Sequence, residues 1–386
     1  MKVRAFIPRI VIILAFISAL SGDFCVSAVA QSQAEQEIGD KFSEAADLVE
    51  DATGSTVASE LTAGIDQVSG HALAESLAPD RLWQEIKSIA ADPLSDGIAL
   101  LGTLLAILLV CAVCKALCSG TATGELSAGV EFLSCAAFIS ALLFSQLSQI
   151  EGVVGYFERL GALMSCMIPV AGGVWAMGGN VSTAAAGSGT LYAMTALTQG
   201  LCASSVLPVC CIMGAGAVCS GLSGSALLGG FCGAVKKVYN FLIGLLMTVF
   251  VFSLGAQTVI TGAADTLSAR GAKLLSSTLI PGVGGAVGES LRTVAGSVAY
   301  VKGVVGVGGI VLICALTLPT LLSLLLSRLA FLIAKGAAEM LGCKRESALL
   351  DEIGGIYGFL VGAVAICSAA FAIAMAIFLR CTVAIA

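Results

Sequence analysis

Residue types able to carry enzyme chemistry are scarce in this sequence. Its 386 residues include a single histidine, His71. The stretch Gly221-Leu222-Ser223-Gly224 fits half of an intramembrane serine-protease signature, but no histidine follows it to act as general base. The sequence also lacks His-Glu-x-x-His, which binds zinc, and Gly-x-x-x-x-Gly-Lys-Ser/Thr, which binds nucleotide phosphates. We therefore expect a protein that is not an enzyme.

The fifteen cysteines lie mostly in apolar runs. Cys111 and Cys114 form the only Cys-x-x-Cys pair, whereas structural zinc sites need clustered ligands. A metal or redox role for this pair is the less favoured alternative, because a buried thiol packs as a small apolar group. No cofactor and no metal are therefore expected.

The composition indicates a membrane protein. Hydrophobic residues make up 58% of the chain and charged residues 11%, whereas a soluble domain is about 25% charged. A lipid-facing surface needs no charge. The acidity is concentrated in residues 31–96, which hold 14 acidic and three basic residues. No part of the chain has the basic surface that nucleic-acid binding requires.

The N-terminus has the features of a secretory signal. Lys2, Arg4 and Arg9 precede or begin a short apolar run, and an Ala-x-Ala site follows it. We expect cleavage between Ala30 and Gln31, which leaves the mature N-terminus outside the cytoplasm. The alternative, a first transmembrane helix, is disfavoured because a span needs about 20 apolar residues.

Residues 31–96 are expected to form an acidic, helical, extracytoplasmic segment. The helical period places four apolar residues on one face: Ile38, Phe42, Ala45 and Ala46. Asp92-Pro93 should end the last helix of the segment. Because it is too polar for the bilayer, the segment suits a small cap or a docking surface for another protein.

Residues 97–386 are expected to form an all-α, polytopic membrane bundle of about six to eight spans. Six uncharged runs are long enough to cross the bilayer: 97–114, 132–150, 160–235, 238–264, 303–327 and 353–379. If residues 31–96 lie outside and the run 160–235 crosses once in net, the positive-inside bias is modest, because the outer side also holds basic residues: Arg159, Arg270, Lys273, Arg292, Lys302 and Arg380. The inner side then holds Lys115, Lys236, Lys237, Lys335, Lys344 and Arg345.

Two proline-glycine motifs indicate an internal duplication. Ile-Pro-Val-Ala-Gly-Gly at 168–173 recurs as Ile-Pro-Gly-Val-Gly-Gly at 280–285, 112 residues later, and Pro208 recurs as Pro319 at nearly the same offset. A chance match in a glycine-rich apolar chain is the alternative. Whether the halves run parallel or inverted stays open. The duplication divides the membrane part into two halves: 130–236 and 238–348.

Each motif combines residues that interrupt a helix. Proline removes a backbone donor and clashes with the preceding turn, and paired glycines add backbone freedom. Broken helices near the membrane middle are typical of transporters. We expect paired discontinuous helices that line a pathway, with these residues at the breaks: Pro169, Gly172, Gly173, Pro281, Gly284 and Gly285. The alternative is two kinked helices that pack tightly.

Other prolines and glycines indicate helix geometry and packing. Pro208 and Pro319 should kink their helices. Gly354, Gly358 and Gly362 have the small-xxx-small spacing of a helix-packing face.

Polar residues are rare within the spans. Arg328 is the best candidate for an intramembrane charge, either buried and functional or reaching toward the interface. Four uncharged polar residues should line a pore or form hydrogen bonds between helices: Asn180, Gln199, Asn240 and Gln257.

The layout combines a signal, an acidic helical segment and a multi-span region. That region contains Leu-Ile-Pro-Gly-Val-Gly-Gly-Ala at 279–286, and it ends with Lys-Arg-Glu at 344–346 and Gly-Gly-Ile-Tyr at 354–357. This pattern resembles the stage III sporulation protein AE family of endospore-forming Firmicutes. The resemblance covers most of residues 97–380 and, more loosely, residues 31–96.

The resemblance implies a role in sporulation. It implies a permease-like, multi-pass protein of the mother-cell membrane around the forespore. Such a protein acts as a channel subunit with other membrane proteins and a separate cytoplasmic ATPase, in the lipid bilayer and without nucleic acid. The alternatives are an autonomous secondary transporter of small solutes and a non-conducting membrane scaffold.

Overall fold

The structure is a computed structural model that describes residues 31–53, 79–121, 124–223, 226–279 and 284–380. This described part is almost entirely helical and contains no strand. In chain order its helices are α2 (Gln31–Thr53), α5 (Pro79–Thr121), α6 (Gly124–Met177), α7 (Val181–Thr198), the π-helical turn η2 (Gln199–Ala203), α8 (Ser204–Ser223), α9 (Ala226–Leu279), α10 (Gly284–Met340) and α11 (Lys344–Arg380).

Six helical stretches are long and apolar enough to cross a membrane: Pro93–Leu117, Phe132–Met177, Val181–Cys219, Gly233–Leu267, Val301–Met340 and Lys344–Leu379. They confirm the prediction of an all-α polytopic bundle. The helices are also much longer than one perpendicular crossing requires. The 57 residues of α10 extend about 85 Å, whereas the hydrocarbon core is about 30 Å thick.

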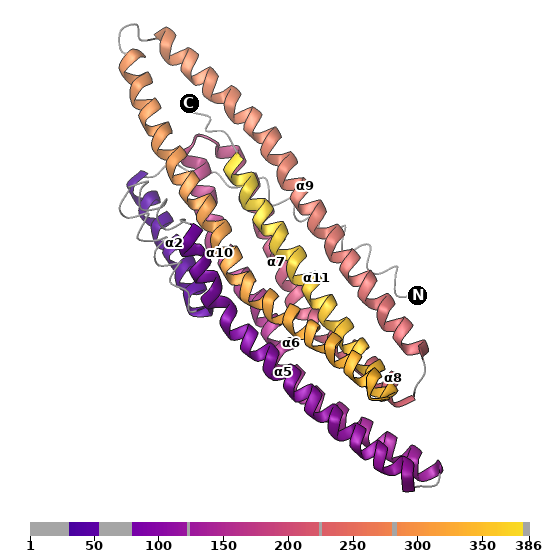
Figure 1. Cartoon of the computed structure of the whole chain (residues 1–386). Helices are drawn as coiled ribbons and strands as arrows, with labels where there is room; N and C mark the ends of the chain where they lie inside the picture. The colour runs from indigo at the N-terminus through magenta and orange to yellow at the C-terminus, as the bar shows by residue number, and fades with distance from the viewer. Residues whose placement is uncertain (1–30, 54–78, 122–123, 224–225, 280–283, 381–386) are drawn as a thin grey trace, which may run out of the picture.

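The six membrane-crossing stretches run in alternating directions along the chain, with α7, η2 and α8 together forming one of them (Figure 1). The contacts between α10 and α11 show this for one pair. Lys335 Nζ lies 2.9 Å from Asp351 Oδ1, and a Cβ atom added at Gly354 would lie 3.6 Å from Phe331 Cβ. The residue numbers of the contact partners therefore increase along α11 as they decrease along α10, so the two helices are antiparallel.

The first helix of each predicted repeat half runs in the same direction as α11. Along α6, Ser134 donates a hydrogen bond to Glu346 of α11 at 3.3 Å, and Tyr156 is hydrogen-bonded to Ser368 at 2.7 Å. Along α9, Asn240 approaches Gly362 and Gly255 approaches Ile377. The end of α6 and the start of α7 thus lie at the same end of the bundle as the end of α9 and the start of α10, which is the placement that a parallel duplication would have.

The two ends of the bundle differ in composition. We call one the lysine end, because it carries Lys115, Lys335 and Lys344 beside the α10–α11 turn. There Lys115 Nζ donates to the carbonyl oxygen of Gly342, in the α10–α11 turn, at 3.2 Å. We call the opposite end the α2 end, because α2, the α6–α7 turn, the end of α9 and the start of α10 lie toward it (Figure 1).

The predicted apolar face of α2 is buried, which confirms that prediction: Ile38, Phe42, Ala45 and Ala46. It packs on α6 and α10, where a Cβ atom added at Gly173 would lie 3.0 Å from Ile38 Cδ1 and one at Gly308 would lie 2.7 Å from Phe42 Cζ. The exposed side of α2 is acidic and carries Asp40, Glu44, Asp47 and Asp51. The start of the acidic segment is therefore part of the wall of the bundle.

One expected helix end is wrong. α5 continues through Pro93 to Thr121, so Asp92-Pro93 does not end a helix. Pro93 is buried, and helices in membrane bundles tolerate proline because their neighbours compensate the lost backbone hydrogen bond. The run 160–235 is also divided: its first part completes α6, and Val181–Cys219 crosses back.

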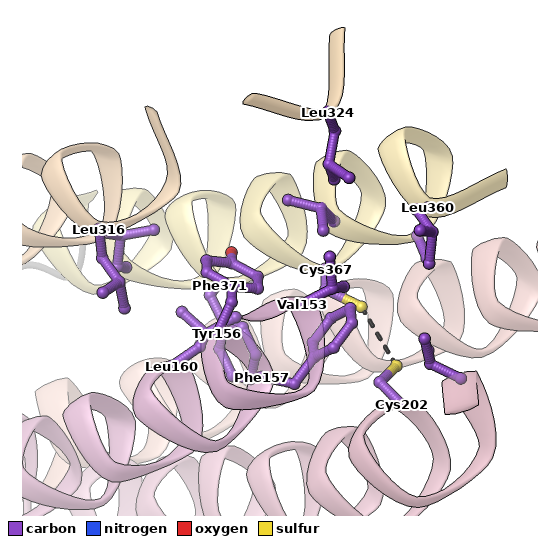
Figure 2. Packing of buried hydrophobic residues seen from close by; sticks show 14 of the residues in the cluster. Val153, Tyr156, Phe157, Leu160, Cys202, Leu316, Leu324, Leu360, Cys367 and Phe371 are labelled. Carbon is purple, nitrogen blue, oxygen red and sulfur yellow. Dashed lines mark hydrogen bonds between the residues drawn. The ribbon is translucent and has the colours of Figure 1, made fainter. Parts of the chain in front are cut away.

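The centre of the core lies where α6 faces α10 and α11 (Figure 2). It is built from large buried side chains: Val153, Tyr156, Phe157 and Leu160 of α6, Leu316 and Leu324 of α10, and Leu360 and Phe371 of α11. Cys202 of η2 and Cys367 of α11 complete this layer, with their sulfur atoms 3.5 Å apart. Both thiols are buried in apolar packing.

Candidate functional site

The first proline-glycine motif lies near the end of α6 and does not break it. α6 continues through Pro169, Gly172 and Gly173 to Met177, so the expected position of the break is wrong. The chain turns at residues 178–180 instead. There Gly179 has a φ of 78°, a left-handed conformation that glycine adopts without steric penalty.

The glycines of this motif allow close packing. A Cβ atom added at Gly172 would lie 2.6 Å from Ser188 Oγ of α7, and one at Gly173 would lie 3.0 Å from Ile38 Cδ1 of α2. Neighbouring helices thus hold α6 on two sides, which is how a membrane bundle tolerates a residue such as Pro169 inside a helix. For this motif the contacts favour the alternative of tight packing.

The second motif and the signal lie largely outside the residues that the structure describes. Pro281 and Ala30 lie outside the described residues. Gly284 and Gly285 begin α10, and Gln31 begins α2. Cleavage after Ala30 and a pathway beside the second motif therefore stay predictions.

The two prolines predicted to kink their helices have different surroundings. Pro208 lies in the first turns of α8, directly after the π-helical turn η2. Such turns are an identified cause of helix kinks. Pro319 lies inside α10, which stays α-helical around it.

The glycine face of α11 meets α9 and α10. A Cβ atom added at Gly354 would lie 3.6 Å from Phe331 Cβ of α10. One added at Gly362 would lie 2.9 Å from Asn240 Nδ2 of α9. Gly358, between them, meets charged groups from both helices. The absence of side chains lets the three helices approach one another.

A carboxylate from α9 closes the N-terminus of α7. Asp265, only 7% exposed, accepts hydrogen bonds from Ser182 N at 3.2 Å and from Thr183 N at 3.0 Å. It also accepts from Thr183 Oγ1 at 2.8 Å and from Ser182 Oγ. The first N–H groups of a helix have no partner within it, and the helix dipole favours a negative charge there. Asp265 thus acts as a cap from another helix and fastens α9 to the α6–α7 turn.

Hydrogen bonds continue from this cap along the α7–α9 contact. Thr183 Oγ1, whose proton is donated to Asp265, lies 2.9 Å from Thr261 Oγ1. Thr190 donates to Gln257 Oε1 one to two turns further on. Of the two roles expected for Gln257, the structure thus shows a hydrogen bond between helices. We call this line the Asp265 seam; its members are Ser182, Thr183, Thr190, Gln257, Thr261 and Asp265.

A second polar cluster joins α6, α10 and α11. Tyr357 Oη lies 2.9 Å from Gln149 Oε1 and also contacts Gln146 Oε1, and its single proton can be donated to only one of these amide oxygens at a time. Ser327 Oγ donates to Gln149 Oε1 at 3.0 Å. Gln146 also lines an apolar groove of about 400 Å³ between α6, α8 and α11. Its buried Nε2 has no hydrogen-bond partner in the described part of the chain.

Chemically, both clusters join helices through hydrogen bonds, and the buried Nε2 of Gln146 is the one polar atom named here without a partner in the described part of the chain. Each carboxylate oxygen of Asp265 already accepts two hydrogen bonds from α7. Among the described residues, no group of three or more His, Cys, Asp or Glu side chains is placed to hold a metal ion.

The sequence analysis missed Asp265. It is the only acidic residue between Glu158 and Glu289, and it directly follows the uncharged run 238–264. An isolated ionisable residue at the end of a span is a signal of function or of a specific partner. Its hydroxyl partners give no such signal, because serine and threonine are common in membrane helices.

Comparison with known proteins agrees with the layout of the chain. The family model described as stage III sporulation protein AE matches residues 67–382. The match covers the membrane bundle from α5 to α11 and part of the acidic segment. No curated protein and no solved structure matches the chain. The chain belongs to the stage III sporulation protein AE family.

Proposed function

We propose that this sporulation protein is a permease-like subunit of a multiprotein channel between the mother cell and the forespore. It acts with other membrane proteins, depends on a separate cytoplasmic ATPase for energy, and is not itself an enzyme. The lysine end faces the mother-cell cytoplasm, in accord with the positive-inside rule. The α2 end faces the space between the two membranes.

The observation that carries this proposal is a helical hairpin that projects from the α2 end. Asp265 lies beside the α6–α7 turn, and α9 continues for 14 residues beyond it to Leu279. The hairpin therefore extends about 20 Å past that turn. Figure 1 shows it reaching beyond the other helices. We call residues 266–279 and 284–297 the α9–α10 arm.

The arm suits a partner protein better than lipid. Its sequence carries Arg270, Lys273, Glu289 and Arg292, and charges are costly in hydrocarbon. A pair of helices outside a bundle also lacks the tertiary packing from which most helices gain their stability. The acidic face of α2 lies toward the same end and offers a second polar surface. A transporter that acts alone requires neither feature.

The arm is tested by replacing residues 268–295 with a short Gly-Ser linker in the sporulating host. The shortened protein should insert and accumulate normally, because the contacts among α5 to α11 remain. Spore formation should fall by at least tenfold, and the other channel proteins should no longer co-purify with the protein. A linker of equal size inserted at Gly342, in the α10–α11 turn, is the matched control.

Two results would contradict the proposal. One is normal spore formation without the arm. The other is uptake of labelled amino acids or other small solutes by the purified protein alone in liposomes, which would favour the autonomous transporter. A protein that keeps its channel partners while no labelled solute passes through the assembled complex would favour the scaffold.

A further inference from the structure

An apolar groove of about 400 Å³ runs between α6, α8 and α11. Along α6 it reaches from Ile139 to Ile150, a length of about 16 Å. Of the residues that line it, only Gln146 and Tyr357 carry an amide or a hydroxyl group. Leu147 lies at its edge and is half exposed, so the groove opens sideways toward the surface of the bundle.

The amide of Gln146 lies in the wall of this groove with one unused group. Ser327 Oγ already donates to Gln149 Oε1, which leaves the single proton of Tyr357 for Gln146 Oε1. The Nε2 donor of Gln146 then remains, and it has no partner in the described part of the chain although the residue is only 5% exposed. A buried donor without an acceptor is unfavourable. An occupant of the groove that carries an acceptor at this level would complete the site.

The groove is too small to admit a helix. A helix with its side chains is about 10 Å across, so 16 Å of helix fills about 1,200 Å³, three times the volume of the groove. An extended hydrocarbon chain needs much less room. Inside a membrane such a chain gains nothing from leaving water, but it gains dispersion contacts by filling a space that would otherwise lack them.

The charges of α6 indicate the level of Gln146 in the bilayer. The uncharged run 132–150 is about 28 Å long, which matches a hydrocarbon core of about 30 Å. Glu151, which ends this run, is exposed and lies one turn beyond Leu147 on the same face. Gln146 is thus about 7 Å inside the polar edge, close to the depth of phospholipid ester groups. From there the groove continues toward the middle of the bilayer.

We propose that this groove binds one acyl chain of a phospholipid and that the ester carbonyl of this chain accepts a hydrogen bond from Gln146 Nε2. The chain runs from Gln146 toward Ile139 along the apolar wall of α6. An ester carbonyl suits the amide because it is an acceptor without a donor of its own. The lipid belongs to the leaflet on the Glu151 side, where the groove meets the polar edge.

Two photoreactive phosphatidylcholine probes test the hydrogen bond. Both carry a diazirine at the middle of one chain, and they differ only in the linkage of that chain, which is an ester or an ether without a carbonyl. In nanodiscs with the purified full-length protein, the ester probe should label α6 around Ile139 about fivefold more than the ether probe. Gln146→Leu, which removes the donor, should bring the two probes to equal labelling.

A second variant tests the groove itself. Gly214 lines the groove, and a Cβ atom added there would have nothing within 4 Å. Gly214→Leu therefore fills part of the groove without distorting α8, and labelling of α6 by the ester probe should fall roughly tenfold. Gly102→Leu is the matched control, because Gly102 is an exposed glycine of α5 that also has nothing within 4 Å. It should leave the labelling unchanged.

Three results would overturn the proposal. The first is equal labelling of the wild type by the ester and ether probes, which decides the question even if a variant does not fold. The second is unchanged labelling of α6 in a folded Gly214→Leu variant. The third comes from sporulating cells with a photoreactive benzoylphenylalanine in place of Leu207, at the open edge of the groove. An adduct with the mass of a lipid is expected there, whereas an adduct with a protein would assign the groove to a partner.

Discussion

Asp265 illustrates how an ionisable side chain is accommodated in this bundle. A carboxylate away from water is stable only when its charge is compensated by hydrogen bonds or by another charge. Backbone and hydroxyl donors of Ser182 and Thr183 provide this compensation, together with the positive end of the α7 dipole. Tyr156 follows the same rule with neutral partners, because its hydroxyl is hydrogen-bonded to Ser368 at 2.7 Å. Such polar residues mark the places where helices are fastened together.

Asp265→Asn should lower the free energy of unfolding by about 1–3 kcal/mol. The amide keeps one acceptor oxygen but loses the charge and places an NH2 group against the donors of α7. Unfolding of the purified protein in detergent, followed by circular dichroism, measures the change. Glu151→Gln, on an exposed position of α6, should stay within about 0.5 kcal/mol of the wild type. Wild-type stability of Asp265→Asn would exclude the capping role.

Close contact between α6 and α7 depends on glycines placed opposite bulky side chains. A Cβ atom added at Gly187 of α7 would collide with the indole ring of Trp175, a fully buried residue of α6. Two residues further along α7, Gly189 has nothing within 4 Å of such an atom. The two glycines therefore differ in function although they share one helix and one residue type.

Gly187→Ala should destabilise the protein by about 1–3 kcal/mol, because the tightly packed indole must move. Gly189→Ala should leave stability unchanged or raise it by up to about 1 kcal/mol, since alanine favours the helix. Thermal unfolding of both variants in the same detergent gives the comparison. Equal effects from the two substitutions would mean that helix propensity, and not the Trp175 contact, decides the outcome.

Pro169→Ala tests whether the first motif is a hinge or a packing site. Alanine restores a backbone donor within a continuous α6, so the variant should be more stable than the wild type, by up to about 3 kcal/mol. Spore formation should remain near the wild-type level, because the glycine contacts with α2 and α7 are unchanged. A stable variant that fails to sporulate would show that the proline acts as a hinge.

Periodicity and apolar length predicted the helices, the six spans and the buried face of α2, because these features depend on local sequence. The ends of the helices were less predictable. Pro93 and Pro169 lie inside helices because tertiary contacts outweigh a local penalty of about 3 kcal/mol. The partners of Asp265 lie 82 and 83 positions away along the chain. No periodic pattern connects residues at that separation, so the seam emerges only from the fold.

At the scale of the whole molecule, the apolar surfaces of α5 and α9 lie at different heights along the bundle. The uncharged run of α5 starts at Gly97, which packs on Leu326 of α10, and Lys115 at its far end reaches Gly342. It therefore lies beside the part of α10 nearest the lysine end.

The uncharged run of α9 lies closer to the α2 end. It begins near Gly358 of α11, and its residue Gly255 lies beside Ile377. Arg328 and Gly358 are at one height, so the run of α9 begins roughly where that of α5 begins and extends in the opposite direction. A bilayer can cover both runs only if the bundle axis is inclined to the membrane normal, as is common for helices longer than the bilayer is thick.

This inclination explains the exposed charges on α6. Glu158 and Arg159 are exposed and follow Tyr156, which is hydrogen-bonded to Ser368. Ser368 lies at the height of the exposed apolar residues Leu245 and Val249 of α9, because Gly244 lies beside Ile366. Glu158 and Arg159 are therefore at that height too. In an upright bundle they would enter hydrocarbon, which is costly for charged groups. In an inclined bundle this side of α6 lies in water while α9 lies in lipid.

Accessibility of single cysteines tests the inclination and the orientation together, in a variant without the fifteen native cysteines. Arg159→Cys and Ser290→Cys should react with an impermeant maleimide on intact cells, since both sites are expected on the outer side. Lys237→Cys should react only after permeabilisation. Val249→Cys, at nearly the same height as Arg159 but on the apolar face of α9, should stay unlabelled in both cases. If Arg159→Cys is as unreactive as Val249→Cys, the bundle stands upright in the membrane, and if Lys237→Cys reacts on intact cells, the lysine end faces outward.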